Sequence, residues 1–480
     1  MIVRDKIYID TAELGSRITD LCELFTHRNP EFYEKKKLKL SVKGVNPYLF
    51  HYIIMRTSGG QTLCLPRGSL KKVKEFYEKN ELVFKVIDNR ISHNEIDVNL
   101  IDTVLEEQQD RVIKVLYENE GGLIEAPPGF GKTISILGLI AKVKQPTLIL
   151  VHEFRLSDQW FFEINKRLKG KFKLGILNGI RKEDGDIVVA IINTAYNIYI
   201  ENPSYFNKFG MVITDEVHHV SAPMFLKVVN NMPAKWRVGV SGTLKRKDKK
   251  EFLMFETIGE CLLSIETNEL KHRITDFEYI FINTNVPYIV PSVSRWTGVK
   301  REKALDIVNA ITELTKLNKR NDIIIENIID CIESGYYPLV LSDRVEHNKF
   351  LYEKLKSLGY KTILIIGKGR SKKDIDWEDI RKDESIQCIV ATTSIASEGL
   401  DLPRLSALHL TCPSSNEPKT KQRVGRIRRI LENKPLPRVY DYVDNQSYFE
   451  DDRGNRFNLF MKMAKKREKV YIKLKKEYNE

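Results

Sequence analysis

Short runs of apolar residues recur along the chain from about residue 104 and alternate with segments of helical periodicity. One set of runs lies at 147–151, 186–192, 211–215 and 238–242, and a second set at 338–342, 361–367, 387–392 and 407–411. Strands that are apolar along their whole length are typical of parallel sheets with helices on both faces. The pattern therefore predicts an α/β fold with two parallel-sheet domains in tandem.

The first hundred residues follow a different pattern, in which apolar and polar residues alternate. The runs KLKLSV (37–42) and YLFHYIIM (48–55) are predicted as strands near the turn Ser58–Gly60. Residues 68–80 are predicted as an amphipathic helix, because one face carries Leu70, Val73, Phe76 and Tyr77. We therefore expect a small α+β module ahead of the two α/β domains.

Two further segments complete the domain organisation. A stretch with two prolines and little periodicity begins at residue 284 and separates the two sets of strands. Residues 462–476 hold eight Lys or Arg and one Glu; such a run is usually a solvated helix face, and the alternative is an arm that contacts phosphates. We expect the α+β module over 1–100 and the first α/β domain over 101–283. A linker over 284–305 leads to the second α/β domain over 306–450, and a basic helical tail follows over 451–480.

Composition narrows the classes of partner. The 78 Lys and Arg against 65 Asp and Glu give a net charge of +13, which suits a polyanion such as nucleic acid or an anionic membrane. No stretch approaches 18 uninterrupted apolar residues and the N-terminus has no apolar signal core, so we expect no membrane association. The six cysteines form no CxxC pair, which argues for reduced thiols in a cytoplasmic protein.

The segment Ala126–Thr133 (APPGFGKT) is a candidate phosphate-binding loop. A strand-like run precedes it and a helical pattern follows, as such a loop requires. The N–H groups of the turn and the helix dipole favour an anion, Lys132 would reach the β- and γ-phosphates, and Thr133 would bind Mg²⁺. Ala126 stands where the usual pattern has glycine. The loop predicts ATP and Mg²⁺ as cofactors.

Two further groups have the chemistry to act on a nucleotide. Asp215 and Glu216 follow an apolar strand, where a Mg²⁺-holding Asp and a water-activating Glu belong; the alternative is an exposed turn. In the second α/β domain, residues 422–429 (QRVGRIRR) carry arginines that would stabilise charge on a transferring phosphoryl group. A basic surface helix is the alternative there. Arginines on a separate domain would let domain closure control hydrolysis.

The order and identity of these motifs resemble superfamily 2 helicases over residues 104–445. The adenine-reading glutamine is matched by Gln108, with Gln109 as the fallback. His152 replaces the commoner proline of motif Ia, and Gly242 the commoner alanine of motif III. The matches in the first α/β domain are motif I at 126–133, Ia at 151–160, Ib at 193–194, II at 215–218 and III at 241–243. The matches in the second are motif IV at 339–347, V at 391–403 and VI at 422–429.

This resemblance implies two tandem RecA-like motor domains and a role for each matched residue. The catalytic residues it implies are Lys132, Asp215, Glu216, Arg426 and Arg429, with Thr133 and Asp215 on Mg²⁺. The nucleotide-binding residues are Gln108, Pro128, Gly129, Phe130, Gly131, Lys132, Thr133, Gly399 and Asp401. The residues implied to contact nucleic acid are Asn193, Thr194, Thr392, Thr393 and Ser394. The residues implied to couple the nucleotide site to the nucleic-acid site are His218, Ser241, Thr243 and Gln422.

Within the superfamily, the chain is most similar to the UvsW-type bacteriophage helicases and more distantly to XPB-like helicases. Three segments carry this similarity: 242–260 after motif III, 317–321 (LNKRN) and 63–77 (LCLPRGSLKKVKEFY). The resemblance implies a DNA helicase that remodels branched or forked DNA with little sequence preference: Holliday-junction migration, fork regression and limited unwinding. It also implies the host cytoplasm if the protein is phage-encoded, and no obligatory protein partner.

The sequence is compatible with three other functions to different degrees. An RNA helicase or transcript-release motor would use the same two domains, because discrimination depends on 2′-hydroxyl contacts. A binding scaffold with a decayed motor is disfavoured by the intact Lys132, Glu216 and motif VI arginines. A restriction-system motor would need a nuclease partner, and the chain has no convincing nuclease motif.

Overall fold

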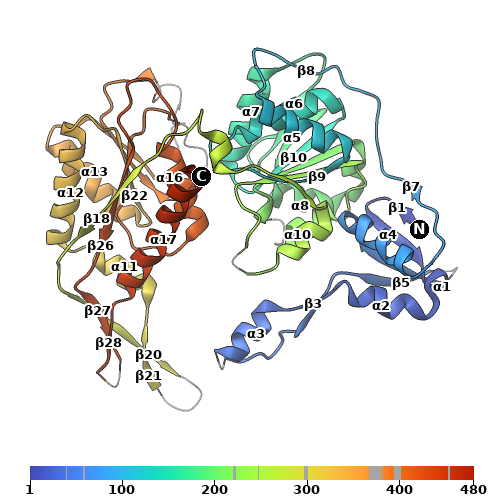
Figure 1. The fold of residues 1–480 in the computed structure, drawn as a ribbon, viewed down its shortest axis with the longest axis horizontal. Coiled ribbons are helices and arrows are strands. Elements are labelled where there is room, and N and C mark those ends of the chain that lie inside the picture. Colours follow the sequence, from blue (N-terminus) through green and yellow to red (C-terminus); the bar gives the residue numbers. More distant parts are fainter. Residues whose placement is uncertain are drawn as a thin grey trace. The chain divides into compact units, whose positions relative to one another are not determined.

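The computed structural model describes residues 1–38, 40–57, 60–219, 223–246, 248–296, 301–366, 380, 382–393, 402–451 and 454–479. Contacts divide the chain into two compact units (Figure 1). The first comprises Met1–Pro127 and Gly131–Ile265, and the second Glu266–Glu480 together with Pro128–Phe130 of the phosphate loop.

A five-stranded sheet forms the N-terminal module of the first unit. Its order is β5 (Ile53–Thr57), β6 (Gly60–Pro66), β2 (Lys6–Asp10), β1 (Ile2–Val3) and β7 (Ile87–Asp88). The predicted amphipathic helix is α4 (Leu70–Lys79), which buries Val73, Phe76 and Tyr77 against this sheet. The prediction for KLKLSV was wrong, because its described residues form the end of α3 (Pro30–Lys37) and a loop with no strand partner.

The module is joined to the first α/β domain through buried arginines. Arg237, 2% exposed, donates hydrogen bonds to the carbonyls of Thr257 (2.7 Å), Met232 (2.8 Å) and Asp5 (3.2 Å). Burial lowers the pKa of Arg237 to about 10. Arg67 of the module donates to the Ala234 carbonyl. Because hydrogen bonds to a buried guanidinium offset the cost of removing its charge from water, these contacts hold the module and the domain together as one unit.

The first α/β domain is built on an eight-stranded sheet, in which every neighbouring pair is parallel except β12 and β13. Its order is β13 (Lys182–Glu183), β12 (Leu174–Leu177), β14 (Ile187–Ile191), β10 (Thr147–Val151), β15 (Met211–Asp215), β16 (Trp236–Ser241), β9 (Gly121–Glu125) and β17 (Cys261–Ser264). The helices are α5 (Glu107–Glu118), α6 (Lys132–Val143), α7 (Phe154–Arg167), α8 (Ile192–Glu201), α9 (Pro223–Val229) and α10 (Glu251–Ile258). All four predicted strands are confirmed.

The second unit contains a six-stranded, wholly parallel sheet. Its order is β18 (Glu278–Asn283), β26 (Arg438–Val443), β25 (Ala407–Leu410), β22 (Pro338–Ser342), β24 (Cys388–Thr392) and β23 (Thr362–Ile365). Its helices include α11 (Ile307–Leu314), α12 (Asn318–Glu333), α13 (Val345–Ser357) and α16 (Glu417–Ile427). The four predicted strands of this set are confirmed as well.

The expected boundary at residue 283 was wrong. The division falls between Ile265 and Glu266, and β18 pairs with β26 along its whole length as an edge strand of the second sheet. Proline content and weak periodicity had marked 284–305 as the linker. That segment instead includes β19 (Tyr288–Ile289) and the antiparallel pair β20 (Ser292–Trp296) and β21 (Arg301–Leu305) within the second unit.

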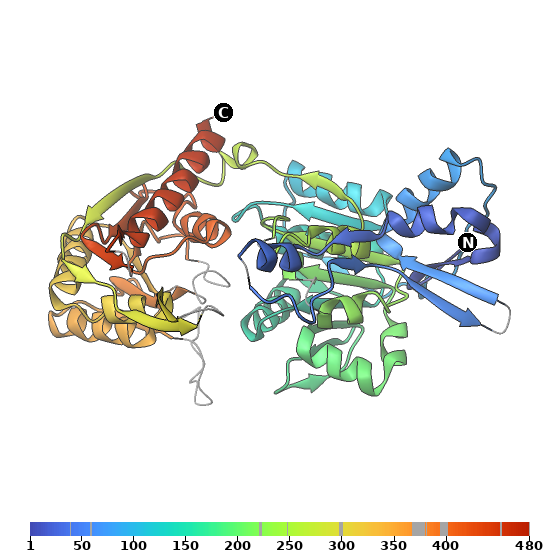
Figure 2. The ribbon, with the colours of Figure 1, turned by 90° about the horizontal axis from the view of Figure 1, so that it is seen from below.

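The basic C-terminal segment is a structural helix, α17 (Leu459–Asn479), which runs along the second unit (Figures 1 and 2). It buries an apolar face with Val470, Tyr471 and Leu474 in the main core of this unit. Arg467, 2% exposed, forms an ion pair with Asp441 at 2.6 Å. Most of the basic residues of α17 are exposed, as the predicted solvated helix face requires. The buried apolar face and the buried Arg467 were not predicted. No helix among the described residues is long and apolar enough to cross a bilayer.

Candidate nucleotide site

The phosphate loop lies between strand β9 and helix α6, as its sequence predicts. Gly129 and Gly131 have φ of +90° and +89°, a left-handed conformation that glycine adopts without strain. Gly131 is the N-cap of α6 and makes no side-chain cap, which leaves the first N–H groups of the helix available to an anion. Lys132 Nζ donates to the Ala126 carbonyl at 3.3 Å. Ala126 is fully buried.

Strand order explains why three motifs meet. Strand β16 lies between β9, which leads into the phosphate loop, and β15, which ends at Asp215. Ser241, the last residue of β16, pairs with Glu125 of β9. Because neighbouring parallel strands end at the same edge of the sheet, motif III (Ser241–Thr243, SGT) lies between the phosphate loop and motif II (Asp215–His218, DEVH). Ser241 is therefore placed to contact Glu216.

Asp215 is held by a residue that the sequence did not point to. Trp160 Nε1 on α7 donates to Asp215 Oδ2 at 2.9 Å, and the backbone N–H of Glu216 donates to Oδ1 at 2.9 Å. Trp160 and Asp215 are 2% and 8% exposed. Burial raises the pKa of Asp215 and the Glu216 carboxylate adds to the rise, against the opposing Trp160 hydrogen bond. A cation beside Asp215 would therefore favour the ionised form of its carboxyl group.

Glu216 has the opposite electrostatic environment. Its backbone is left-handed (φ +46°), and its Oε1 lies 3.8 Å from Lys132 Nζ. Its Oε2 lies 3.1 Å from Ser241 Oγ and 3.3 Å from His218 Nδ1. Burial would raise the pKa of Glu216, but Lys132 and His218 outweigh burial and hold the pKa below its ordinary value. Glu216 is therefore ionised at neutral pH and can accept a proton or a hydrogen bond.

Ser241 has more partners than its one proton can serve. Its Oγ lies 2.7 Å from the Thr243 carbonyl, 3.1 Å from Glu216 Oε2 and 2.8 Å from His218 Nδ1. A hydroxyl donates once and accepts up to twice, so at any moment the proton serves either Glu216 or the Thr243 carbonyl. This choice links the state of the Glu216 carboxylate to the backbone of the SGT loop.

The residues fit a nucleotide with Mg²⁺. Mg²⁺ in ATP sites is held by one or two protein oxygens, with phosphates and water completing the shell. Asp215 and the half-buried Thr133 have the oxygen atoms that such a site would use. No group of three or more His, Cys, Asp or Glu suited to a metal occurs among the described residues, so a metal cage made by protein alone is not present there.

In the second unit, α16 separates the arginines of QRVGRIRR into two classes. Arg423 and Arg428 are 3% and 2% exposed, and Arg428 Nε donates to the Thr275 carbonyl at 2.7 Å. Both side chains are packed inside this unit. Arg426, on the last turn of α16, and Arg429, just beyond it, are both half-buried. Of the four, these two remain the candidates for nucleotide contact, and Gln422 is half-buried on the same helix.

The residues predicted to contact nucleic acid differ in how exposed their side chains are. Asn193 is exposed and Thr194 half-buried on the first turn of α8. Thr392 and Thr393 are 7% and 4% exposed, so their side chains do not form the surface track expected of them. The other members of motif V, Ser394, Gly399 and Asp401, lie outside the described residues.

Of the two candidate glutamines, Gln109 is fully buried and its Oε1 accepts from the backbone N–H of Glu106 at 3.1 Å in a capping box. Its Oε1 is thus committed to the helix start. Gln108, which is half-buried, remains the candidate for adenine.

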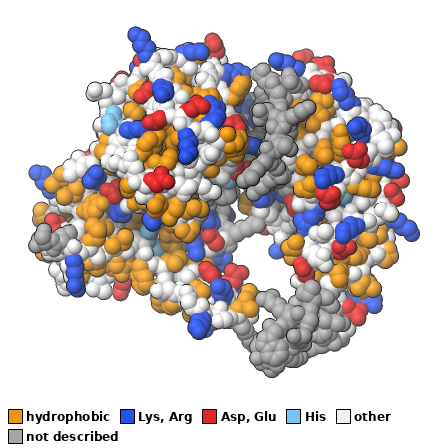
Figure 3. Space-filling view, turned by 180° about the vertical axis from the view of Figure 1, so that it is seen from behind, with side chains coloured by type: hydrophobic (Ala, Val, Ile, Leu, Met, Phe, Trp, Pro, Cys, Tyr) orange, Lys and Arg blue, Asp and Glu red, His pale blue; other side chains and the backbone are white. Residues whose placement is uncertain are grey.

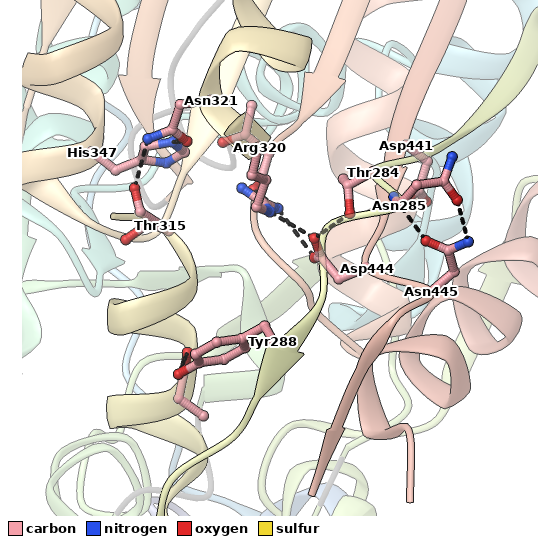
Figure 4. A network of polar contacts seen from close by, with 12 residues as sticks. Thr284, Asn285, Tyr288, Thr315, Arg320, Asn321, His347, Asp441, Asp444 and Asn445 are labelled. Atoms are coloured by element: carbon pink, nitrogen blue, oxygen red, sulfur yellow. Dashed lines mark hydrogen bonds and ion pairs between the residues drawn. The ribbon is translucent and has the colours of Figure 1, made fainter. Parts of the chain in front are cut away.

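The LNKRN segment opens α12 and builds a polar network behind the second sheet (Figure 4). Arg320, fully buried, pairs with Asp444 at 2.7 Å, and Thr284 Oγ1 donates to the same carboxylate at 3.1 Å. Asn321 Nδ2 donates to the Thr315 carbonyl at 2.9 Å. Its Oδ1 lies 3.1 Å from Nε2 of a buried histidine, His347. The segment therefore fixes α12 to the end of β26.

Two family descriptions match the chain. Residues 90–246 match "Type III restriction enzyme, res subunit" and residues 319–431 match "Helicase conserved C-terminal domain". A probable helicase of Escherichia phage T5 is 32% identical over 328 residues, 67% of this chain and 67% of that protein. A putative ATP-dependent RNA helicase of Acanthamoeba polyphaga mimivirus is 28% identical over 446 residues (90% and 82%). The DNA 3'-5' translocase XPB2 of Sulfurisphaera tokodaii is 26% identical over 407 residues (76% and 91%).

A solved structure with a TM-score above 0.5 supports the fold. Yeast (S. cerevisiae) Dbp5 bound to RNA and ADP BeF3 matches with a TM-score of 0.54 at 14% identity, over 76% of this chain and 86% of that chain. T4 UvsW matches over 96% and 94% with a TM-score of 0.39 at 17% identity. The chain has two RecA-like domains that carry a phosphate loop, DEVH and QRVGRIRR. The phage T5 helicase is similar to it over two thirds of each chain. The chain belongs to the superfamily 2 helicases, ATP-dependent enzymes that act on nucleic acid.

Proposed function

We propose that the chain is a DNA translocase that remodels branched DNA through junction migration, fork regression and limited unwinding, in recombination, repair or replication. The observation that carries the proposal is the continuous contact path from Lys132 through Glu216 and Ser241 to Thr243. Such a path joins nucleotide chemistry to a loop outside the phosphate site. The XPB2 relative, named a DNA translocase, and the UvsW-like segment 63–77 of the N-terminal module support DNA as the track.

ATP, when bound with Mg²⁺, supplies the phosphoryl group whose transfer to water drives movement. Lys132 neutralises phosphate charge, while Asp215 and Thr133 hold Mg²⁺. Glu216, kept ionised by Lys132 and His218, accepts a hydrogen bond from the attacking water. Arg426 and Arg429 supply positive charge to the transition state. Gln108 recognises adenine.

The track is the backbone of one strand, with Asn193 and Thr194 among its contacts. Binding through phosphates makes affinity dependent on salt and largely independent of sequence. A motor needs this independence, because it must traverse any sequence. The viral origin of several relatives supports action in the host cytoplasm.

An RNA helicase is the second candidate, since the mimivirus relative that matches 90% of this chain is named an RNA helicase. The test is ATPase stimulation by a four-way junction, a fork, a linear duplex and single-stranded RNA at equal nucleotide concentration. We expect the junction and the fork to stimulate most. Stimulation by RNA above every DNA would reject the DNA proposal.

A further inference from the structure

An ordered arm projects from the N-terminal module. We define the arm as residues 26–56, comprising β3 (Thr26–Arg28), α3, the following loop, β4 (Tyr48–Phe50) and most of β5. Strands β3 and β4 pair at its base. Asn29 caps α3, accepting from the Glu31 N–H at 3.2 Å, and its Nδ2 donates to the Asn46 carbonyl at 2.8 Å. Figure 1 shows α3 away from the sheet of the module.

The arm concentrates positive charge. On the face seen in Figure 3, Lys and Arg are spread among hydrophobic side chains over both units and form no single large patch. The arm holds seven basic and two acidic side chains, a net charge of +5 out of +13 for the chain. The basic residues are Arg28, Lys35, Lys36, Lys37, Lys39, Lys43 and Arg56. One of the two acids, Glu31, is paired with Lys35 at 2.6 Å.

Large apolar and aromatic side chains are exposed beside these cations. Helix α3 buries none of its residues. The exposed side chains include Tyr33 (36%), Leu38 (59%), Tyr48 (43%), Phe50 (54%) and Ile53 (56%). Lysines alone would serve contact with a duplex backbone. Exposed aromatic faces beside lysines are what unpaired bases require, because bases stack on such rings while the backbone meets the cations.

The base of the arm is clamped to the first motor domain. Glu256 on α10, 7% exposed, lies 3.0 Å from His27 Nε2, 2.7 Å from His51 Nδ1 and 3.3 Å from Lys72 Nζ. The His27 ring stacks on Phe252 of the same helix at 3.8 Å. Helix α10 follows the SGT motif in sequence. The arm is therefore anchored on the first motor domain rather than loosely attached.

We propose that the arm binds unpaired nucleic acid at a branch point. Tyr33, Tyr48 and Phe50 stack on exposed bases, and Lys36, Lys37 and Lys43 contact the phosphates between them. This deepens the function proposed above and rests on it, since it gives the motor a contact that a continuous duplex does not offer. The arm thereby selects branched over linear DNA.

The stacking part is tested by binding without nucleotide, measured by fluorescence anisotropy with the full chain. The probes are a labelled single strand of DNA, a fork and a blunt duplex. We expect the double variant Tyr48→Ala/Phe50→Ala to bind the single strand and the fork about tenfold more weakly, and the duplex within about twofold. The matched control is Phe162→Ala, an exposed ring (44%) elsewhere in the same unit, which leaves all three affinities unchanged.

The phosphate part is tested by salt dependence. Lys36→Ala/Lys37→Ala should lower the slope of log affinity against log salt by about 1.4 on the single strand, about 0.7 for each lost contact. Lys114→Ala, with its side chain 70% exposed on α5, is the control.

Unchanged binding by the arm variants overturns the inference and leaves the apolar patch to a protein partner. An equal loss on duplex and single strand also overturns it, because the arm is then a general backbone contact. The proposed function would fail by a different result. In that case no DNA would stimulate ATP hydrolysis by the wild type, whatever the arm variants bind.

Discussion

Trp160 and Asp215 are joined by a buried hydrogen bond of 2.9 Å, in which the indole N–H holds one oxygen of the carboxylate that faces the nucleotide site. The indole comes from α7 and is the last residue of motif Ia, whereas Asp215 ends β15. The bond fixes the orientation of a group proposed to bind Mg²⁺. Partners of this kind commonly alter metal affinity about 10–100-fold when they are removed.

Trp160→Phe tests this role. The ring still fills its space but the N–H is lost, so the Mg²⁺ concentration for half-maximal ATPase should rise about tenfold. The measurement is a Mg²⁺ titration at saturating ATP. Trp236→Phe is the control, because that ring lies in β16 of the same unit and packs on Tyr117. An unchanged Mg²⁺ requirement in Trp160→Phe would show that the bond is only structural.

Ser241→Ala tests coupling. The substitution removes the hydroxyl that joins Glu216 to the Thr243 carbonyl but leaves Lys132 beside Glu216. We expect DNA strand displacement to fall at least tenfold more than ATP hydrolysis does. Both rates are measured on the same forked DNA. If the two rates fall together, Ser241 supports hydrolysis rather than its transmission.

Acid stability tests the Glu256 clamp. Burial would raise the pKa of Glu256, but hydrogen bonds from His27 and His51 outweigh it and lower the pKa to about 2. A carboxylate whose pKa is lower in the folded state stabilises the fold at every pH above its pKa in the unfolded state, which is about 4.5. This stabilisation is lost as the pH falls from 4.5 towards 2. Glu256→Gln should therefore destabilise the first unit at pH 7 by about 2 kcal/mol or more, and the difference from wild type should shrink below pH 4.5.

Urea unfolding at several pH values measures this difference. Glu260→Gln is the control, because its pair with Lys71 (2.9 Å) is exposed and surface pairs contribute little. A difference between Glu256→Gln and wild type that stays constant from pH 7 to pH 3 contradicts the clamp.

The buried pair Arg467–Asp441 tests whether α17 belongs to the second motor domain. Removing the guanidinium leaves a buried carboxylate unpaired, which typically costs about 3–5 kcal/mol. We expect Arg467→Met to lower the unfolding midpoint of the second unit markedly, and Lys473→Ala, whose side chain is 69% exposed, to leave it unchanged. Equal midpoints for both variants would show that the Arg467–Asp441 pair does not hold α17 to the second unit.

The strands and the phosphate loop could be predicted because their signals are local. An apolar run of five residues or a glycine turn before Lys132 is complete within one segment. The Trp160–Asp215 bond and the Glu256 clamp join residues 55 and more than 200 positions apart, so no window of sequence contains them. Trp160 in particular has the pattern of an ordinary core residue on an amphipathic helix.

The errors have physical causes too. The domain boundary was placed too late because β18 is an edge strand whose partner, β26, lies about 160 residues further along. The C-terminal helix and its solvated face were predicted, but its packing was not, because charge counts do not reveal that one arginine, Arg467, pairs with Asp441. The side chains of Thr392 and Thr393 match motif V in identity, yet burial removes them from the surface.

In the proposed function, ATP bound at Lys132 drives movement on branched DNA. The direct measurement is conversion of a labelled four-way junction into forked products, with wild type and Lys132→Ala compared at equal junction binding. Wild type should convert the junction only with hydrolysable ATP and Mg²⁺, and Lys132→Ala should bind it but convert none. Conversion by Lys132→Ala at the wild-type rate, or by wild type without ATP, would contradict the account.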